Sequence, residues 1–250
     1  MEKIKANRLL LAGDSWMDRK TWYDEIFDSE QVTNLAVTGS GNKYIAESVI
    51  SHVTSGNEVD HVLVCWSGLN RIDVPMPLGA RPGYVKNECQ RRETWASRYW
   101  TNYVAPWRDR GSPLQIDESF IKMMYQEKGY VSVKNQALIN VLNLQNFLKV
   151  KQIPYLFCFL YDYTNTDFDH NHLTGENDVG NFATLGSVAG SHPILAEIDR
   201  EHCLEPTGLE WGLEQDEEYF IDPIHFTDEG YRAWAKQMFQ NYITKPGRQE

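Results

Sequence analysis

The chain has 250 residues, of which 42% are hydrophobic and 24% are charged, and this balance excludes a disordered or fibrous protein. The formal net charge is −11 at pH 7, which disfavours binding to nucleic acid or to an anionic membrane because both are polyanions. We therefore expect neither as a partner. The length suffices for one large hydrophobic core, and we interpret residues 1–250 as a single domain.

The opening stretch of the chain and its cysteines favour a cytoplasmic location. The opening stretch MEKIKANRLLLAG has basic residues, but its apolar run is too short for a secretory signal or a membrane-spanning helix. The four cysteines form no C-x-x-C pair, and Cys65 and Cys158 lie inside apolar runs. They are therefore expected to be buried thiols in a reducing compartment.

Apolar runs and helical patterns alternate along the chain. In chain order the predicted elements are strand 7–13, helix 19–27, strand 32–37, helix 42–53, strand 60–66, helix 133–152, strand 153–161 and helix 227–243. The strands are apolar on both faces, which is typical of a parallel sheet covered by helices. This order predicts an open α/β sheet, whose sites form at the carboxyl ends of the strands.

Two long segments interrupt this alternation. Residues 71–131 are rich in aromatic side chains, and residues 162–217 are rich in Asp, Asn, Gly and His. Both follow predicted strands and are longer than ordinary connections. We interpret them as insertions near the site.

Short polar pieces follow three of the predicted strands, and a fourth precedes the last helix. They are Gly13-Asp14-Ser15, NLAVTG at 34–39, SGLN at 67–70 and DPIHFTDEG at 222–230. The first three would share one edge of a parallel sheet, so residues distant in sequence can converge there.

These pieces contain the groups that acyl transfer requires. Ser15 supplies a hydroxyl nucleophile, His225 a base, and Asp222 a carboxylate to orient the imidazole. The backbone N–H groups of Ser15 and Gly39, together with the amide of Asn70, could bind the oxyanion. The hypothesis is therefore a catalytic triad with an oxyanion hole.

In this order, Gly13-Asp14-Ser15, Gly39, Gly68-x-Asn70 and Asp222-x-x-His225 resemble the blocks of the SGNH, or GDSL, hydrolase superfamily. The resemblance implies a flavodoxin-like three-layer α/β/α fold and a serine hydrolase that needs neither a metal nor another cofactor. Arg71 departs from the Asp that many members have after the asparagine. Gly41 competes with Gly39 for the oxyanion role, but the register of NLAVTG favours Gly39.

Each piece alone has a simpler interpretation. Asp14 or Ser15 could cap a helix, Gly39 could be a turn glycine, and Asn70 could be a loop cap. Asp222 and His225 could belong to a surface turn. The four pieces together, in order and at strand ends, favour the functional interpretation.

Some residues are candidates for substrate contact. Asp14, Trp16 and Arg71 adjoin the motifs, while Trp95 and Trp100 lie at helical spacing in the aromatic segment. These two tryptophans could pack beneath a lid or line a groove that stacks sugar rings.

A calcium loop is the alternative interpretation of DFDHNHLTGEND, residues 167–178. Its Asp167, Asp169, Asn171 and Asp178 occupy ligand positions, but the sixth position is His172, where such a loop needs glycine. We therefore expect a solvated acidic loop and no metal.

The sequence thus predicts an esterase, with a small O-acetyl group on a carbohydrate as the first substrate class. The alternatives are a thioesterase or lysophospholipase-like acylhydrolase, and a non-catalytic carbohydrate-binding or assembly module. The sequence does not fix the oligomeric state.

Overall fold

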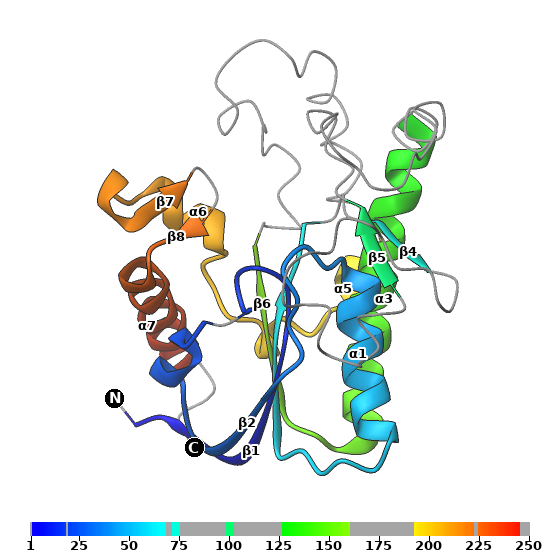
Figure 1. The fold of residues 1–250 in the computed structure, drawn as a ribbon, viewed down its shortest axis with the longest axis horizontal. Helices are drawn as coiled ribbons and strands as arrows, with labels where there is room; N and C mark the ends of the chain where they lie inside the picture. The colour runs from blue at the N-terminus through cyan, green and yellow to red at the C-terminus, as the bar shows by residue number, and fades with distance from the viewer. Residues whose placement is uncertain are drawn as a thin grey trace.

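The structure is a computed structural model that describes residues 2–18, 20–68, 72–75, 99–102, 127–160, 193–222 and 225–245. Figure 1 shows its elements in chain order. They are β1 (Ile4–Ala12), η1 (Trp22–Glu25), β2 (Phe27–Asn34), α1 (Asn42–Thr54), β3 (His61–Trp66), β4 (Ile72–Pro75), β5 (Tyr99–Asn102), α3 (Glu127–Lys151), β6 (Tyr155–Phe159), α5 (Pro193–Glu197), η5 (Arg200–His202), α6 (Gly208–Leu213), η6 (Glu217–Tyr219), β7 (Phe220–Asp222), β8 (His225–Phe226) and α7 (Asp228–Thr244).

The four predicted core strands form one parallel sheet in the order β2-β1-β3-β6. The apolar runs in β1, β3 and β6 contain consecutive buried residues, as expected for strands that are covered on both faces of the sheet. β1 has β2 on one side and β3 on the other, so the chain reverses its direction of winding here. Such a switch point opens a crevice at the carboxyl ends of the two strands.

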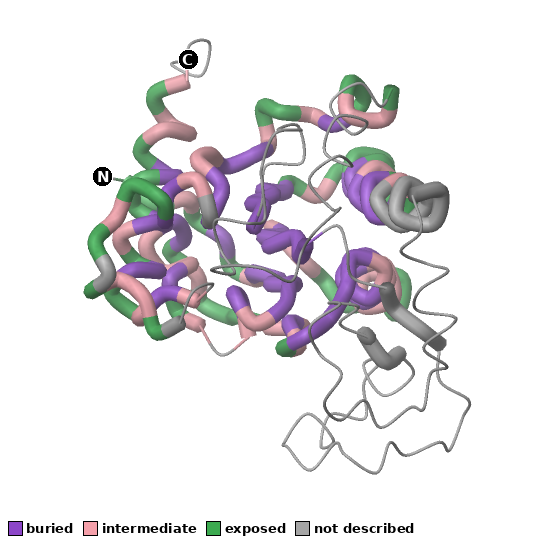
Figure 2. Tube along the Cα trace, turned by 90° about the horizontal axis from the view of Figure 1, so that it is seen from above, coloured by how far each residue is buried: buried purple, intermediate pink, exposed green. Residues whose placement is uncertain are grey.

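Helices cover both faces of this sheet, as Figures 1 and 2 show. Leu9 and Leu11 of β1 pack into a cluster with side chains of α7, whereas Leu10 and Ala12 pack with α1 and α3. Buried residues are concentrated in the strands and on the helix faces turned toward them. The predicted three-layer α/β/α architecture with a parallel sheet is therefore confirmed.

The last helix begins where the sequence predicts. Thr227 is the N-cap of α7, and its Oγ1 accepts a hydrogen bond from the Gly230 N–H at 3.1 Å. Apolar residues at spacings of three and four then form one buried stripe. The stripe consists of Tyr231, Trp234, Ala235, Met238 and Phe239.

The connection from β1 to β2 differs from the prediction. The expected helix at 19–27 is only the short 3-10 helix η1, and Phe27 already pairs with Ile4 of β1. β2 therefore begins before the predicted strand at 32–37. This edge strand carries exposed polar side chains after Phe27, and the search for apolar runs missed it. The chain stays bonded to β1 as far as Val37, whose N–H donates to the Gly13 carbonyl at 3.1 Å.

Residues 99–102, within the aromatic segment, form strand β5, although the spacing of the aromatic residues here is also compatible with one face of a helix. β5 pairs antiparallel with β4, and Trp100 is the register partner of Val74. Aromatic and β-branched residues favour a strand where a partner strand is present.

Part of the second predicted insertion belongs to the packed core. Ile198, Leu204 and Trp211 are buried, and the Leu204 N–H donates to the carbonyl of Phe157 in β6 at 2.7 Å. Cys203 forms a parallel bridge with Phe157. The stretch around Cys203 thus extends the sheet beyond β6, although too briefly to count as a strand.

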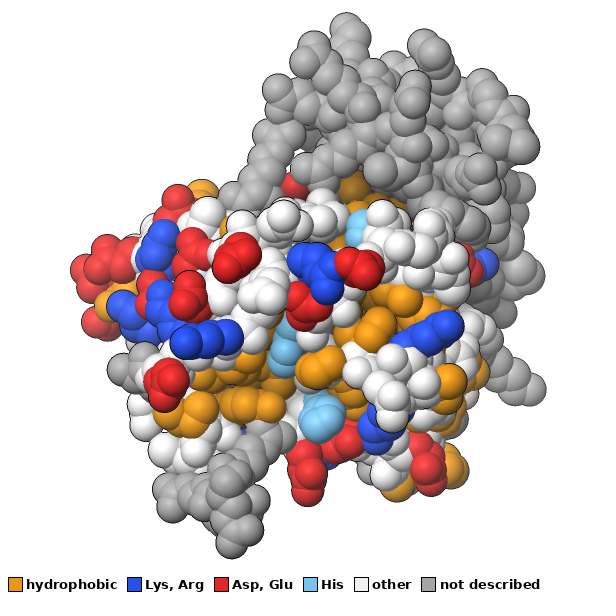
Figure 3. Space-filling view, turned by 90° about the horizontal axis from the view of Figure 1, so that it is seen from below, with side chains coloured by type: hydrophobic (Ala, Val, Ile, Leu, Met, Phe, Trp, Pro, Cys, Tyr) orange, Lys and Arg blue, Asp and Glu red, His pale blue; other side chains and the backbone are white. Residues whose placement is uncertain are grey.

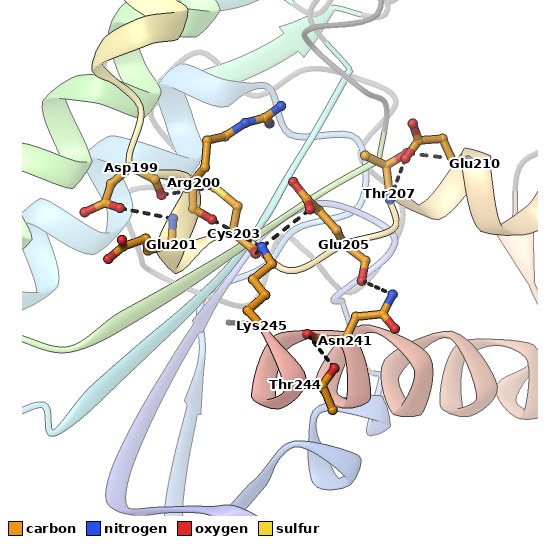
Figure 4. Close-up of polar contacts among 10 residues, drawn as sticks. All are labelled: Asp199, Arg200, Glu201, Cys203, Glu205, Thr207, Glu210, Asn241, Thr244 and Lys245. Atoms are coloured by element: carbon orange, nitrogen blue, oxygen red, sulfur yellow. Dashed lines mark hydrogen bonds and ion pairs between the residues drawn. The ribbon is translucent and has the colours of Figure 1, made fainter. Parts of the chain in front are cut away.

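Side-chain contacts fix this stretch against α7, as Figure 4 shows. The Lys245 Nζ donates to the Cys203 carbonyl at 3.2 Å and forms an ion pair with Glu205 at 3.4 Å. The Asn241 Nδ2 donates to the Glu205 carbonyl at 3.1 Å. Thr207 and Glu210 then close a capping box that starts α6. These contacts hold the start of α6 against Trp16, which follows β1.

The opposite end of the sheet presents a mixed surface. Seen from the amino-terminal ends of the strands, acidic, basic and histidine side chains alternate with small apolar patches (Figure 3). Arg8 of β1 pairs here with Glu58 and Asp60. Within the described residues, none of the helices combines the length and apolar character required to cross a membrane.

Candidate active site

The site begins at the turn that ends β1. The Asp14 carbonyl accepts hydrogen bonds from the N–H groups of Met17 and Asp18 at 3.0 and 2.8 Å, which turns the chain sharply at Ser15. Gly13 is required before this turn, because a Cβ there would lie 2.9 Å from the Cys65 carbonyl oxygen and from Met17 Cβ. Close packing of Gly13 on β3 therefore fixes where Ser15 leaves the sheet.

The structure brings Ser15 and His225 together from opposite ends of the chain. The Ser15 Oγ and the His225 Nε2 lie 2.9 Å apart, within hydrogen-bond distance. Both residues are only partly buried, whereas Phe226, beside the histidine, is fully buried and anchors β8. The hydroxyl and the imidazole thus lie at the carboxyl edge of the sheet, where a ligand can reach them.

Asp222 is placed by the backbone. It ends β7 and is the register partner of His225 across the antiparallel β7–β8 pair. Residues opposite each other in such a pair have neighbouring Cβ atoms. The role of the Asp222 side chain as the group that orients His225 stays a prediction.

Gly39 lies in the loop after β2 and has a φ of +88°, a left-handed conformation that favours glycine. Gly41, the alternative, has a φ of −97° and is the N-cap of α1. The Ser40 Oγ donates to the Gly13 carbonyl at 2.9 Å, so this loop is attached to the turn that carries Ser15. The positive φ explains why residue 39 is a glycine, whereas the role of its N–H in binding an oxyanion stays a prediction.

A second contact joins the same two loops. Asp18 accepts hydrogen bonds from the backbone N–H of Thr38 at 3.2 Å and from its hydroxyl at 2.9 Å. Sequence reasoning missed this pair, because Thr38 belongs to the piece NLAVTG but nothing in the sequence indicates that it bonds to Asp18. The loops carrying Ser15 and Gly39 are thus joined on both sides of Gly39.

Asp14 and Trp16 occupy interior positions, which does not favour the substrate contact expected for them. Asp14 is fully buried, and its carboxylate accepts hydrogen bonds from the Trp16 N–H and the Ser67 hydroxyl, each at 3.0 Å. The Trp16 ring is 1% exposed and packs edge-on against Phe226 and Trp234. Both residues flank Ser15 and hold its turn in place.

The loop after β3 also has partners that the motifs did not indicate. Asn42, the first residue of α1, is buried and bonds through its side chain to the backbone of Ser67 and Gly68. An asparagine within the first turn of a helix gave no signal in the sequence. Its contacts become evident only when α1 is seen against the end of β3.

Several predicted residues lie outside the described part of the structure. Asn70, Arg71, Trp95 and the acidic loop at 167–178 are among them, and Trp100 is described only as a backbone position in β5. Within the described residues, no group of three or more His, Cys, Asp or Glu side chains could hold a metal ion.

No family model matches this sequence, and a search of curated proteins finds no similar one. Among solved structures, the chain is similar to a catalytic mutant of an acetylxylan esterase from Geobacillus stearothermophilus, with 12% identity, a TM-score of 0.46 and coverage of 98% of this chain and 97% of that one. It is also similar to a lipolytic protein of the G-D-S-L family from Veillonella parvula, with 11% identity, a TM-score of 0.41 and coverage of 95% and 98%. The acetyl xylan esterase AlAXEase gives 14% identity, a TM-score of 0.41 and coverage of 94% and 100%.

These likenesses concern the fold. Their low identities transfer no substrate to this chain.

Proposed function

We propose that this chain is a serine hydrolase that cleaves an ester. The observation that carries the proposal is the 2.9 Å separation of the Ser15 Oγ and the His225 Nε2 at the carboxyl edge of the parallel sheet. An aliphatic hydroxyl is a weak nucleophile unless a base takes its proton as it attacks. Here an imidazole nitrogen lies in hydrogen-bond contact with the hydroxyl, as that step requires.

The reaction would proceed in two halves. The Ser15 oxygen bonds to the carbonyl carbon of the ester while its proton passes to His225. The C–O bond to the alcohol then breaks, and the alcohol leaves with the proton from His225. Water attacks the acyl-enzyme, again losing a proton to His225, and the acid is released as Ser15 regains its proton.

Asp222 would hold the imidazole in the correct tautomer and stabilise its charged form. The backbone pairing of Asp222 with His225 supports this role. The N–H groups of Ser15 and Gly39 and the side-chain amide of Asn70 would donate to the oxyanion. The positive φ of Gly39 and the contacts joining its loop to the Ser15 turn support the second of these donors.

A small O-acetyl group on a carbohydrate is the proposed substrate class. It rests on the aromatic segment with Trp95 and Trp100, since aromatic faces stack on sugar rings. The competing substrates are thioesters and lysophospholipids. Acetylated xylo-oligosaccharides are suitable first compounds because two of the structures of similar fold are acetyl xylan esterases by name.

The test combines turnover with covalent labelling. We expect the chain to hydrolyse p-nitrophenyl acetate and to be labelled by a fluorophosphonate at Ser15, and Ser15→Ala should abolish both. Ser55→Ala, at an exposed serine beyond the far end of α1, is the matched control and should change neither. Equal turnover by the wild type and Ser15→Ala would instead support a non-catalytic binding module.

The substrate class is tested separately. Release of acetate from acetylated xylo-oligosaccharides, at a kcat/KM above that for a thioester or a lysophospholipid, is the expected result. A preference for either competitor would overturn the carbohydrate assignment while leaving the hydrolase intact.

A further inference from the structure

Three loops at the carboxyl edge of the sheet meet around one buried amide. Asn42 is 1% exposed and is the first residue of α1, so its side chain enters the site region from the loop that follows β2. Its Oδ1 accepts a hydrogen bond from the Ser67 N–H at 2.9 Å. Its Nδ2 lies 3.2 Å from the Ser67 carbonyl oxygen and 3.4 Å from that of Gly68. One side chain therefore binds both backbone polar groups of Ser67, the first residue after β3.

Ser67 is also connected to the turn that carries Ser15. The Ser67 hydroxyl donates to the Asp14 Oδ2 at 3.0 Å, while the Asp14 Oδ1 accepts the N–H of Trp16 at 3.0 Å. Asp14 and Trp16 are the two neighbours of Ser15. A continuous path of hydrogen bonds thus runs from Asn42 through Ser67 and Asp14 to the residues on both sides of Ser15.

All members of this path are buried, so water does not compete for their hydrogen bonds. Asp14 and Ser67 are fully buried, and Ser40, which attaches the Asn42 loop to Gly13, is 3% exposed. Buried networks in which each polar group has its partners hold one geometry rigidly. Rigidity at this place is unnecessary for the sheet itself, because β1 and β3 already pair directly.

We propose that Asn42 is a positioning residue, which sets the loop after β3 at the distance from Ser15 that oxyanion binding needs. The proposal rests on the proposed function. Gly68 is two residues before Asn70 in the sequence, and Asn70 is the oxyanion donor that the proposed function assigns to this loop. An oxyanion contact forms in the transition state, and a misplaced donor therefore lowers kcat more than it changes KM.

A matched control exists in α3, which packs beside α1 on the same face of the sheet. Gln145 of α3 is 2% exposed and makes the same type of clamp. Its Nε2 donates to the Glu197 carbonyl at 2.8 Å, and its Oε1 accepts the Asp199 N–H at 2.7 Å. Both amides bind a backbone donor and a backbone acceptor in the interior, but among the described residues the partners of Gln145 are Glu197 and Asp199 and not the neighbours of Ser15.

The experiment compares Asn42→Ala, Asn42→Asp and Gln145→Ala in the full chain on p-nitrophenyl acetate. We expect both Asn42 variants to lower kcat by about 10- to 100-fold with KM nearly unchanged. Gln145→Ala should lower Tm but change kcat by less than about 2-fold. Asn42→Asp preserves the side-chain volume and the oxygen that accepts from the Ser67 N–H. It removes only the Nδ2 contacts with the Ser67 and Gly68 carbonyls, and it therefore serves as the test if the alanine variant fails to fold.

A double-mutant cycle with Asn70→Ala separates positioning from general stability. If Asn42 acts through the donor on this loop, its substitution should lower kcat by less than about 3-fold in the Asn70→Ala background. A full loss in that background, or a loss no larger than that of Gln145→Ala, would overturn the proposal. Failure of the proposed function would be seen differently, as turnover that survives Ser15→Ala.

Discussion

Gly208 packs directly against the ring of Trp16. A Cβ at residue 208 would approach the Trp16 Cζ3 to 2.2 Å and the Cη2 to 2.6 Å. Trp16 is fully enclosed and follows Ser15, so it cannot retreat without disturbing the turn that bears the proposed nucleophile. The glycine at the start of α6 is therefore a packing requirement of the candidate site.

Gly208→Ala should destabilise the protein by about 1–3 kcal/mol, as overpacking of a core does, although alanine favours a helix. Gly212→Ala in the same helix is the control. Its Cβ would lie no closer than 3.1 Å to the rings of Phe220 and Phe226, which is a much milder contact. Urea unfolding of both variants checks the difference. Equal stability of the two would show that the Trp16 ring adapts.

Asn70→Ala should lower kcat by about 10²–10³-fold while leaving the melting temperature nearly unchanged, by comparison with removal of one oxyanion donor elsewhere. Asn57→Ala is the control, since the Asn57 side chain bonds to the exposed carbonyl of His52 at 2.9 Å, far along α1. A variant that loses stability and activity together would make Asn70 a structural residue.

Thr227→Ala should cost about 0.5–2 kcal/mol of stability, because it removes the N-cap of α7. The control within the same helix is Thr244→Ala, whose hydroxyl donates to the Gln240 carbonyl at the exposed end. Thermal unfolding monitored by circular dichroism distinguishes them. Two similar shifts would indicate that the cap contributes little.

The stability of the protein should fall as the pH is lowered below about 6.5. Burial lowers the pKa of His61 to about 4, with a smaller effect of His202, and its Nε2 has no hydrogen-bond partner among the described residues. Between pH 6.5 and 4 the unfolded chain therefore binds a proton that the folded chain excludes, which costs up to about 3 kcal/mol. Above pH 6.5 both states are neutral at this residue and the loss vanishes.

His61→Phe should flatten this pH dependence, since phenylalanine keeps the ring contact with Phe27, whose centroid lies 4.9 Å from that of His61. Free energies of unfolding measured in urea at pH 7 and pH 5 provide the check. An unchanged difference between the two pH values in the variant would assign the acid sensitivity to other groups.

Buried elements with strong periodicity were predictable from the sequence. The strands β1, β3 and β6 and the helices α1 and α7 appear within a few residues of their expected bounds, because their side chains face the core on a regular repeat. The pairing of Ser15 with His225 was expected from the order of the motifs and not from strand order, because His225 lies in the antiparallel β7–β8 pair outside the parallel sheet.

Edges and local contacts were not predictable. The first half of β2 has an exposed polar pattern, so its strand conformation comes from pairing with β1 and not from its own residues. Asn42 binds the backbone of the distant loop after β3, and Asp14 binds the hydroxyl of Ser67 in the same loop. Such partners depend on tertiary placement, which a single sequence does not reveal.

The pairing of residue 15 with residue 225 spans 210 positions, nearly the whole chain. During synthesis on a ribosome, the entire parallel sheet emerges before the imidazole is made. A product cut short before β8 would keep all four sheet strands and yet lack the proposed base. Under the proposed mechanism, hydrolysis can begin only after β8 has been made and His225 has docked beside Ser15.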